Sequence, residues 1–71
     1  METSPTIQVR LNGEAYALSA PATVANLVAV RRPRPPFAVE VNKQLVRRPG
    51  YHTTELCDGD EVEIVTLVGG G

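Results

Sequence analysis

The C-terminal stretch from Asp58 to Gly71 reads DGDEVEIVTLVGGG and carries the strongest fold signal in the chain. It opens with Asp58-Gly59-Asp60, a combination of residues typical of a tight turn. Apolar and acidic residues then alternate over Glu61–Thr66, which predicts a strand whose apolar side chains, Val62 and Ile64, face the core. Because this strand runs into three consecutive glycines, we expect residues 67–71 to form a flexible tail.

Working back towards the N-terminus, four further segments read as strands. Asn12-Gly13 separates the first two of them and is a strong hairpin signal, because both residues tolerate a positive φ. In the second strand we expect Tyr16 and Leu18 to face the core. The predicted strands are Ile7–Leu11, Ala15–Leu18, Phe37–Val41 and the short Leu45–Val46. The segment from Tyr51 to Leu56 has no clear pattern and is expected to be irregular.

One helix is predicted between the second and third strands. Thr23 is a suitable N-cap, since its hydroxyl can accept a hydrogen bond from a free N–H of the first turn. Val24, Leu27 and Val28 follow at a spacing that places them on one helical face. Pro33 prevents the helix from continuing, so its expected length is about three turns. Strands that flank a single helix indicate an α+β fold, in which the helix covers one face of a sheet.

Length and composition limit the classes of function. A chain of 71 residues is expected to form one domain, residues 1–71, too small for a deep active site of its own. Its net charge of -1 argues against nucleic acid as the main partner. A single cysteine excludes an internal disulfide and fits a reducing compartment. The N-terminus does not resemble a signal peptide, and no apolar run is long enough for a bilayer. We therefore expect a soluble, cytoplasmic protein with no membrane partner.

Three stretches resemble the ThiS family, the sulfur carriers of thiamine biosynthesis. They are Val9–Gly13, Phe37–Asn42 and the segment from Leu56 to Gly71. The resemblance implies the ubiquitin-like β-grasp fold, a mixed sheet of four to five strands packed on one helix. The related MoaD family, the small subunit of molybdopterin synthase, commonly has an aromatic residue and prolines before its terminal glycines. This chain has Thr66-Leu67-Val68 there, which favours the thiamine branch.

The same resemblance implies a specific chemistry for the tail. A ThiF-like adenylyltransferase would use ATP and Mg²⁺ to convert the Gly71 carboxylate into an acyl-adenylate. Sulfur from a cysteine desulfurase would then produce a thiocarboxylate, and a ThiG-like thiazole synthase would accept the sulfur. The chain itself would be a carrier and not an enzyme, and it would bind no cofactor or metal. Trimming to an earlier glycine remains open.

Residues just before Gly71 are predicted to bind the partner enzymes. Gly69 and Gly70 lack a Cβ, so their backbone can approach the wall of a narrow channel closely. Val65, Leu67 and Val68 form an apolar cluster that starts on the sheet face opposite Val62. Such a cluster suits either a protein interface or a local contact at the sheet edge, and the sequence favours neither.

Other chemistry-bearing residues have simpler interpretations. A lone cysteine such as Cys57 is more often a small buried hydrophobe than a nucleophile, and His52 alone makes no metal site. The run from Arg31 to Pro36 contains a Pro-x-x-Pro spacing, but a helix end with solvated arginines accounts for it. Asp58, Asp60, Glu61 and Glu63 are interpreted as a solvated face in preference to a calcium site.

Three alternative functions remain open at the level of sequence. The chain could carry sulfur to molybdopterin or to another sulfur-containing metabolite. It could be a ubiquitin-like modifier whose tail is joined to lysine side chains. It could also be a β-grasp module that binds partners without covalent chemistry, in which case masking the terminal carboxylate would have no effect.

Overall fold

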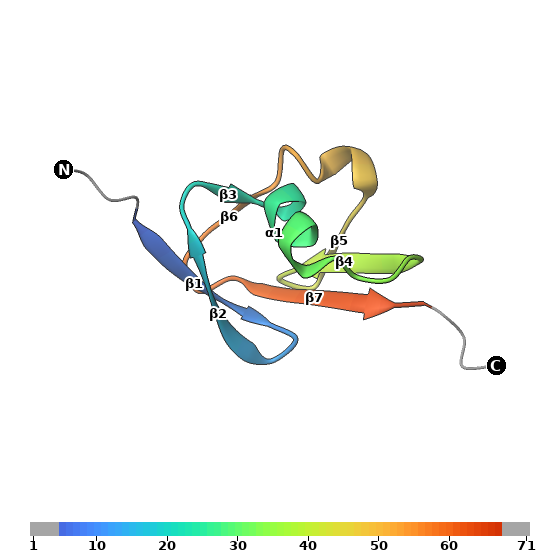
Figure 1. The fold of residues 1–71 in the computed structure, drawn as a ribbon, viewed down its shortest axis with the longest axis horizontal. Coiled ribbons are helices and arrows are strands. Elements are labelled where there is room, and N and C mark those ends of the chain that lie inside the picture. The colour runs from blue at the N-terminus through green and yellow to red at the C-terminus, as the bar shows by residue number, and fades with distance from the viewer. Residues whose placement is uncertain (1–4, 68–71) are drawn as a thin grey trace.

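The computed structural model of the chain describes residues 5–67, which form a curved sheet with one helix across it (Figure 1). In chain order the elements are β1 (Thr6–Leu11), β2 (Glu14–Ser19), β3 (Ala22–Thr23), α1 (Val24–Arg31), β4 (Phe37–Val41), β5 (Gln44–Val46), a 3-10 helix (Arg48–Gly50), β6 (Glu55–Leu56) and β7 (Glu61–Thr66). The predicted α+β class is confirmed.

The main sheet has five strands in the order β2-β1-β7-β4-β5, and a separate two-stranded sheet joins β3 to β6. The pairing of β1 with β7 is parallel, while the other pairs are antiparallel, so the main sheet is mixed as predicted. The C-terminal strand therefore lies in the middle of the sheet, between β1 and β4. A central strand has backbone partners on both sides, which makes it a firm base for whatever follows it.

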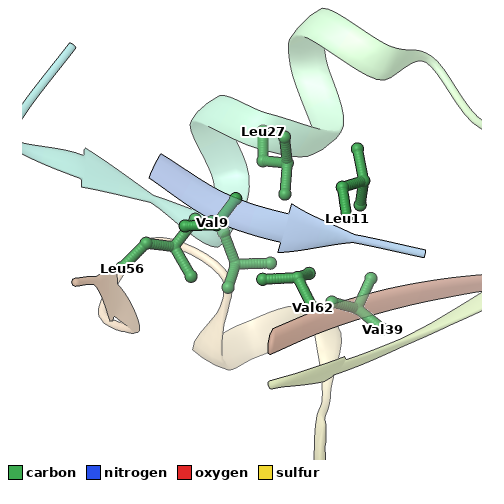
Figure 2. Close-up of a cluster of buried hydrophobic side chains, with 7 residues drawn as sticks. Val9, Leu11, Leu27, Val39, Leu56 and Val62 are labelled. Atoms are coloured by element: carbon green, nitrogen blue, oxygen red, sulfur yellow. The ribbon is translucent and has the colours of Figure 1, made fainter. Parts of the chain in front are cut away.

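The core lies between the sheet and α1, as Figure 2 shows for its central side chains. These residues share almost complete burial: Val9, Leu11, Val24, Leu27, Val39, Leu56 and Val62. Burying a Val or Leu side chain contributes about 1.5 to 3 kcal/mol. Tyr16, Leu18 and Ile64 are half-buried and pack against this cluster, as their strand positions predicted.

The helix is shorter than the sequence predicted. It has eight residues, Val24–Arg31, which is little more than two turns and not three. Arg32 ends it in the left-handed conformation at φ 50, with its N–H donating to the Val28 carbonyl at 2.8 Å. Pro33 disfavours a right-handed helical conformation for the residue before it, so the turn ends there. No helix within residues 5–67 has the length and apolarity needed to cross a bilayer.

The start of α1 carries the predicted N-cap and an additional device that the sequence did not reveal. The Thr23 hydroxyl accepts from the Asn26 N–H at 3.2 Å, and the Asn26 side chain accepts from the Thr23 N–H at 2.8 Å. This is a reciprocal capping box. The next two free N–H groups, of Val24 and Ala25, donate to the carbonyls of Thr54 and Tyr51, both at 2.9 Å.

The segment Tyr51–Leu56 is therefore not simply irregular, as had been expected. Its last two residues form β6, which pairs with β3 in the register Ala22↔Leu56. Both residues of that pair are buried. Strands of two residues are too short to show an alternating pattern, so only their tertiary pairing reveals them.

Candidate functional site

The site predicted from the sequence begins where β7 leaves the sheet. Phe37 of β4 lies opposite Thr66, the last residue of β7. One residue further, the Leu67 N–H still donates to the Pro36 carbonyl at 2.7 Å. The chain thus remains hydrogen-bonded to the sheet through Leu67, which the sequence had assigned to the tail. The remaining predicted site residues, Val68, Gly69, Gly70 and Gly71, lie outside the described residues.

Asn12 secures β7 close to this exit point. Its backbone N–H donates to the Val62 carbonyl at 2.9 Å. Its side-chain oxygen accepts from the Ile64 N–H at 2.9 Å, and its side-chain amide donates to the Ile64 carbonyl at 3.2 Å. The side chain extends the β1–β7 pairing after the backbone of β1 has turned away. The sequence identified Asn12 only as a turn residue, so this second role was missed.

Asn42 secures the opposite end of β7 in a similar way. Both asparagines begin a hairpin turn with φ 51. The Asn42 side-chain oxygen accepts from the Glu61 N–H at 3.0 Å, while its amide donates to Asp60 Oδ1 at 3.0 Å. The asparagine that ends the β4 motif is therefore a structural clamp on the last strand.

The two aspartates beside β7 are also used by the fold. Asp58 Oδ1 accepts from the Gln8 N–H at 2.7 Å, and Asp60 Oδ2 accepts from the Cys57 N–H at 2.8 Å. These bonds tie the turn to β1 and close it on itself. Among residues 5–67, no group of three or more His, Cys, Asp or Glu residues is placed to hold a metal ion. Glu61 and Glu63 are exposed on the sheet, as predicted.

An apolar patch lies on the sheet face that α1 does not cover. Val65 and Leu67 are 47% and 55% exposed, which agrees with the prediction that Val65 faces away from Val62. Across the sheet, Ala38 lies opposite Val65. Leu45 of β5 is 54% exposed. It lies opposite Glu40 of β4, which in turn lies opposite Glu63 of β7. Alternation along each strand places these apolar residues on one face. We call Ala38, Leu45, Val65 and Leu67 the outer-face patch.

Strand register explains why the sequence found only half of this patch. Val65 and Leu67 are close together in the sequence, and the alternation in β7 is clear. Ala38 and Leu45 join them through the pairing of β4 with β7 and with β5. That pairing cannot be inferred from any single strand. The patch adjoins the exit point of the chain, because Leu67 belongs to both.

The lone cysteine does not behave as predicted. Cys57 is exposed, so its interpretation as a small buried hydrophobe is wrong. It opens the turn that Asp60 closes, and its carbonyl accepts from the Asp60 N–H at 3.0 Å. The buried position next to it belongs to Leu56, and alternation then directs the Cys57 side chain outward. His52 is exposed.

Comparison with known proteins gives consistent matches over most of the chain. The model of the ThiS family matches residues 9–71. The uncharacterized protein ycf40 of Porphyra purpurea is 35% identical over 68 residues, which cover 92% of this chain and 93% of that protein. The sulfur carrier protein ThiS of Bacillus subtilis is 54% identical over 33 residues, covering 46% of this chain and 50% of the relative.

A solved structure matches the fold. The crystal structure of the thiamine biosynthesis protein ThiS from Geobacter metallireducens superposes with a TM-score of 0.77 at 25% identity. The match covers 92% of this chain and 100% of the other. The β-grasp fold that the sequence predicted is thereby confirmed.

Proposed function

The chain belongs to the ThiS family of ubiquitin-like sulfur carriers, and on this basis we propose that it carries sulfur for thiamine biosynthesis on the carboxylate of Gly71. The observation that carries the proposal is the position of the glycine run in the fold. It follows the central strand of the sheet after two residues, Leu67 and Val68, and within residues 5–67 the hydrogen bonding of this strand extends to Leu67.

The chemistry requires a partner, because a free carboxylate is a poor electrophile. In the proposed reaction a ThiF-like adenylyltransferase joins the Gly71 carboxylate to the α-phosphate of ATP and releases pyrophosphate, with Mg²⁺ bound in the partner. A cysteine persulfide formed through a cysteine desulfurase then displaces AMP and gives an acyl disulfide. A second thiol of the partner enzymes cleaves its S–S bond, which releases the thiocarboxylate and leaves a disulfide on the partner. A ThiG-like thiazole synthase takes the sulfur. In this scheme the acid, base and metal-binding groups belong to the partners, and the carrier acts as a protein substrate.

The structure of the described part fits the mechanical demands of this role. Four residues follow Leu67, and in an extended conformation they span at most about 14 Å. That length separates Gly71 from the folded domain enough to enter a pocket of the partner. The asparagine clamps and the Pro36 hydrogen bond fix the point from which this distance is measured. The glycines lose conformational entropy when they are ordered, so affinity must come mainly from the folded surface.

The outer-face patch is the surface best suited to supply that affinity. It adjoins the exit point, and it exposes large apolar side chains that the fold leaves without a covering element among the described residues. Burial of such side chains at the centre of an interface is the main source of binding energy between proteins. We therefore assign Val65 and Leu67 to partner binding, together with Val68, Gly69 and Gly70 of the tail.

The decisive test is intact-mass analysis of the full chain after incubation with ATP, a cysteine desulfurase and the cognate adenylyltransferase. We expect a species with the mass of one sulfur in place of one oxygen, and a chain that lacks Gly71 should not form it. Absence of this species from the complete mixture would refute the proposed function. Transfer of the tail to lysine side chains would favour the modifier alternative instead.

A further inference from the structure

Five of the seven basic residues of the chain gather at the end of the domain where β7 leaves the sheet. The loop of residues 32–36 carries two of them, Arg32 and Arg34, and its last residue is Pro36, whose carbonyl accepts from Leu67. We call the set the arginine collar, and its members are Arg31, Arg32, Arg34, Arg47 and Arg48.

Two surface hollows show how the collar surrounds the exit point. One lies on the helix side, where Arg31 and Pro33 face Ile64 and Thr66 of β7. The other lies towards β5, where Arg47 and Arg48 share a hollow with Pro35, Pro36 and Phe37. Thr66 precedes Leu67 in the chain, and Pro36 lies beside Leu67 and accepts its N–H. Cationic side chains are thus present on both sides of the point at which the chain exits.

The fold makes little use of these charges. All five collar side chains are exposed. Within residues 5–67, the guanidinium that donates a hydrogen bond belongs to Arg10, which lies outside the collar and contacts the Gly13 carbonyl at 3.1 Å. Among the described residues Arg31 has one contact in the fold, since its guanidinium lies 5.5 Å from the centre of the Tyr16 ring. The other collar arginines are exposed on the described part of the chain, where a partner surface can reach them.

Acidic residues gather at the other end of β7. Asp58 and Asp60 form the turn before the strand. Glu40, Glu61 and Glu63 line a hollow on the outer face, where Arg10 and Lys43 offset part of their charge. A strand of six residues is about 20 Å long, which exceeds the Debye length of about 8 Å at physiological ionic strength. The net charge of -1 therefore hides a separation of charge along β7, with arginines at one end and an excess of carboxylates at the other.

We propose that the arginine collar docks onto carboxylates that surround the entrance of the partner pocket receiving the tail. This inference rests on the proposed function and names the chemistry of the partner surface. A tail that is extended in the partner pocket reaches at most about 14 Å beyond Leu67, so the collar would meet the rim of the pocket and not the nucleotide inside it. Arginine pairs with carboxylates through two parallel hydrogen bonds, and complementary charge accelerates association.

A protein rim fits this surface better than a nucleic acid does. A phosphate backbone that contacted the collar and continued along the sheet would meet Glu40, Glu61 and Glu63, which repel it. The carboxylates around the entrance of a single pocket would face only the collar, so they would not extend to these glutamates. The apolar outer-face patch beside the collar is likewise suited to a protein surface.

The test compares two charge-reversed forms of the full chain as substrates of the adenylyltransferase, using ATP–pyrophosphate exchange. One form combines Arg34→Glu with Arg47→Glu in the collar. The control combines Arg10→Glu with Lys43→Glu, which changes the net charge equally but at the outer-face hollow that these two residues line with Glu40, Glu61 and Glu63. We expect the KM for the collar form to rise about tenfold at low salt, with kcat nearly unchanged. The control should change KM less than about twofold.

Salt dependence and folding provide the remaining readouts. The difference in KM between wild type and the collar form should shrink as salt shortens the Debye length from about 10 Å to about 3 Å. Urea unfolding should show that both forms are folded, and the milder pair Arg34→Gln and Arg47→Gln should give an intermediate KM. Equal KM values for the collar form and the wild type, or an equal rise in the control, would overturn the inference while leaving the proposed function intact. Oligonucleotide binding lost in the collar form, with KM unchanged, would overturn it in favour of a nucleic acid.

If the wild-type chain supports no exchange at all, the proposed function fails, and the collar inference fails with it.

Discussion

Removing the Asn12 side chain should loosen the last strand close to the exit point of the tail. Asn12→Gly keeps the positive φ of the turn but deletes both side-chain hydrogen bonds to Ile64. Asn12→Ala deletes the same bonds and also forces a residue with a Cβ into the left-handed region. The two variants therefore separate the contribution of the hydrogen bonds from that of the turn.

The structure allows the expected losses of stability to be estimated. Each of the two hydrogen bonds is partly exposed to water and contributes about 0.5 to 1 kcal/mol, so their loss costs about 1 to 2 kcal/mol. The left-handed conformation costs an alanine about 1 to 2 kcal/mol more. We expect Asn12→Gly to lower the free energy of unfolding by about 2 kcal/mol and Asn12→Ala by about 3 kcal/mol. A domain of this size is stable by only about 4 to 10 kcal/mol in total.

Urea unfolding measures these losses, and amide hydrogen exchange locates them. The Ile64 N–H should exchange faster in Asn12→Gly, because its acceptor is gone. Asn42→Gly is the matched control, since Asn42 has the same φ of 51 and its side chain accepts from the Glu61 N–H. That variant should accelerate exchange at Glu61 and leave Ile64 protected. If Asn12→Gly is as stable as the wild type and Ile64 stays protected, the Asn12 clamp does not exist in solution.

Three further perturbations test other parts of the argument. Leu27→Ala should lower the free energy of unfolding by about 3 kcal/mol, because the Leu27 side chain of α1 is fully buried. A loss below about 1 kcal/mol in urea unfolding would contradict the assigned core. Gly59→Ala should lower the free energy of unfolding by at least about 1 kcal/mol, because φ is +91 at this position. Gly50→Ala should be nearly neutral, because φ is not positive there and no atom lies closer than 3.7 Å to the new Cβ. Equal effects of the two substitutions would contradict the strain argument. Val65→Asp should raise the KM for the adenylyltransferase about tenfold without loss of stability. Val30→Asp, at an exposed position of α1, should leave this KM unchanged. Similar KM values for the two variants would show that the outer-face patch is not part of the interface.

Much of the candidate site could be identified before the structure, because its signals are local. The glycine run and the strand before it are contiguous, and alternation predicted that Val65 faces away from Val62. The turn residues Asn12 and Gly13 were identified for their tolerance of positive φ, and both have it, at 51 and 85. Each of these properties depends on residues within a few positions of one another.

The collar and the rest of the outer-face patch could not be found in this way. For the run from Arg31 to Pro36 the sequence favoured a helix end with solvated arginines, and the three arginines of this run are exposed. Arg47 and Arg48, which follow β5, had been assigned only to a loop. Their relation to Leu67 depends on the pairing of β4 with β7, which joins residues about 30 positions apart. Leu45 reaches the same face through a second pairing, that of β5 with β4.

The amino-acid sequence by itself determined the α+β class, the first hairpin, the cap of α1 and the strand that precedes the glycines, because alternation, turn chemistry and capping act over a few residues. Only the tertiary structure decided that β7 lies at the centre of the sheet, that β3 pairs with β6, that Cys57 faces outward and that two asparagines clamp the last strand. These features depend on which distant segments pair and in what register. The register is fixed only in the assembled five-stranded sheet, because one face of that sheet must bury its apolar side chains.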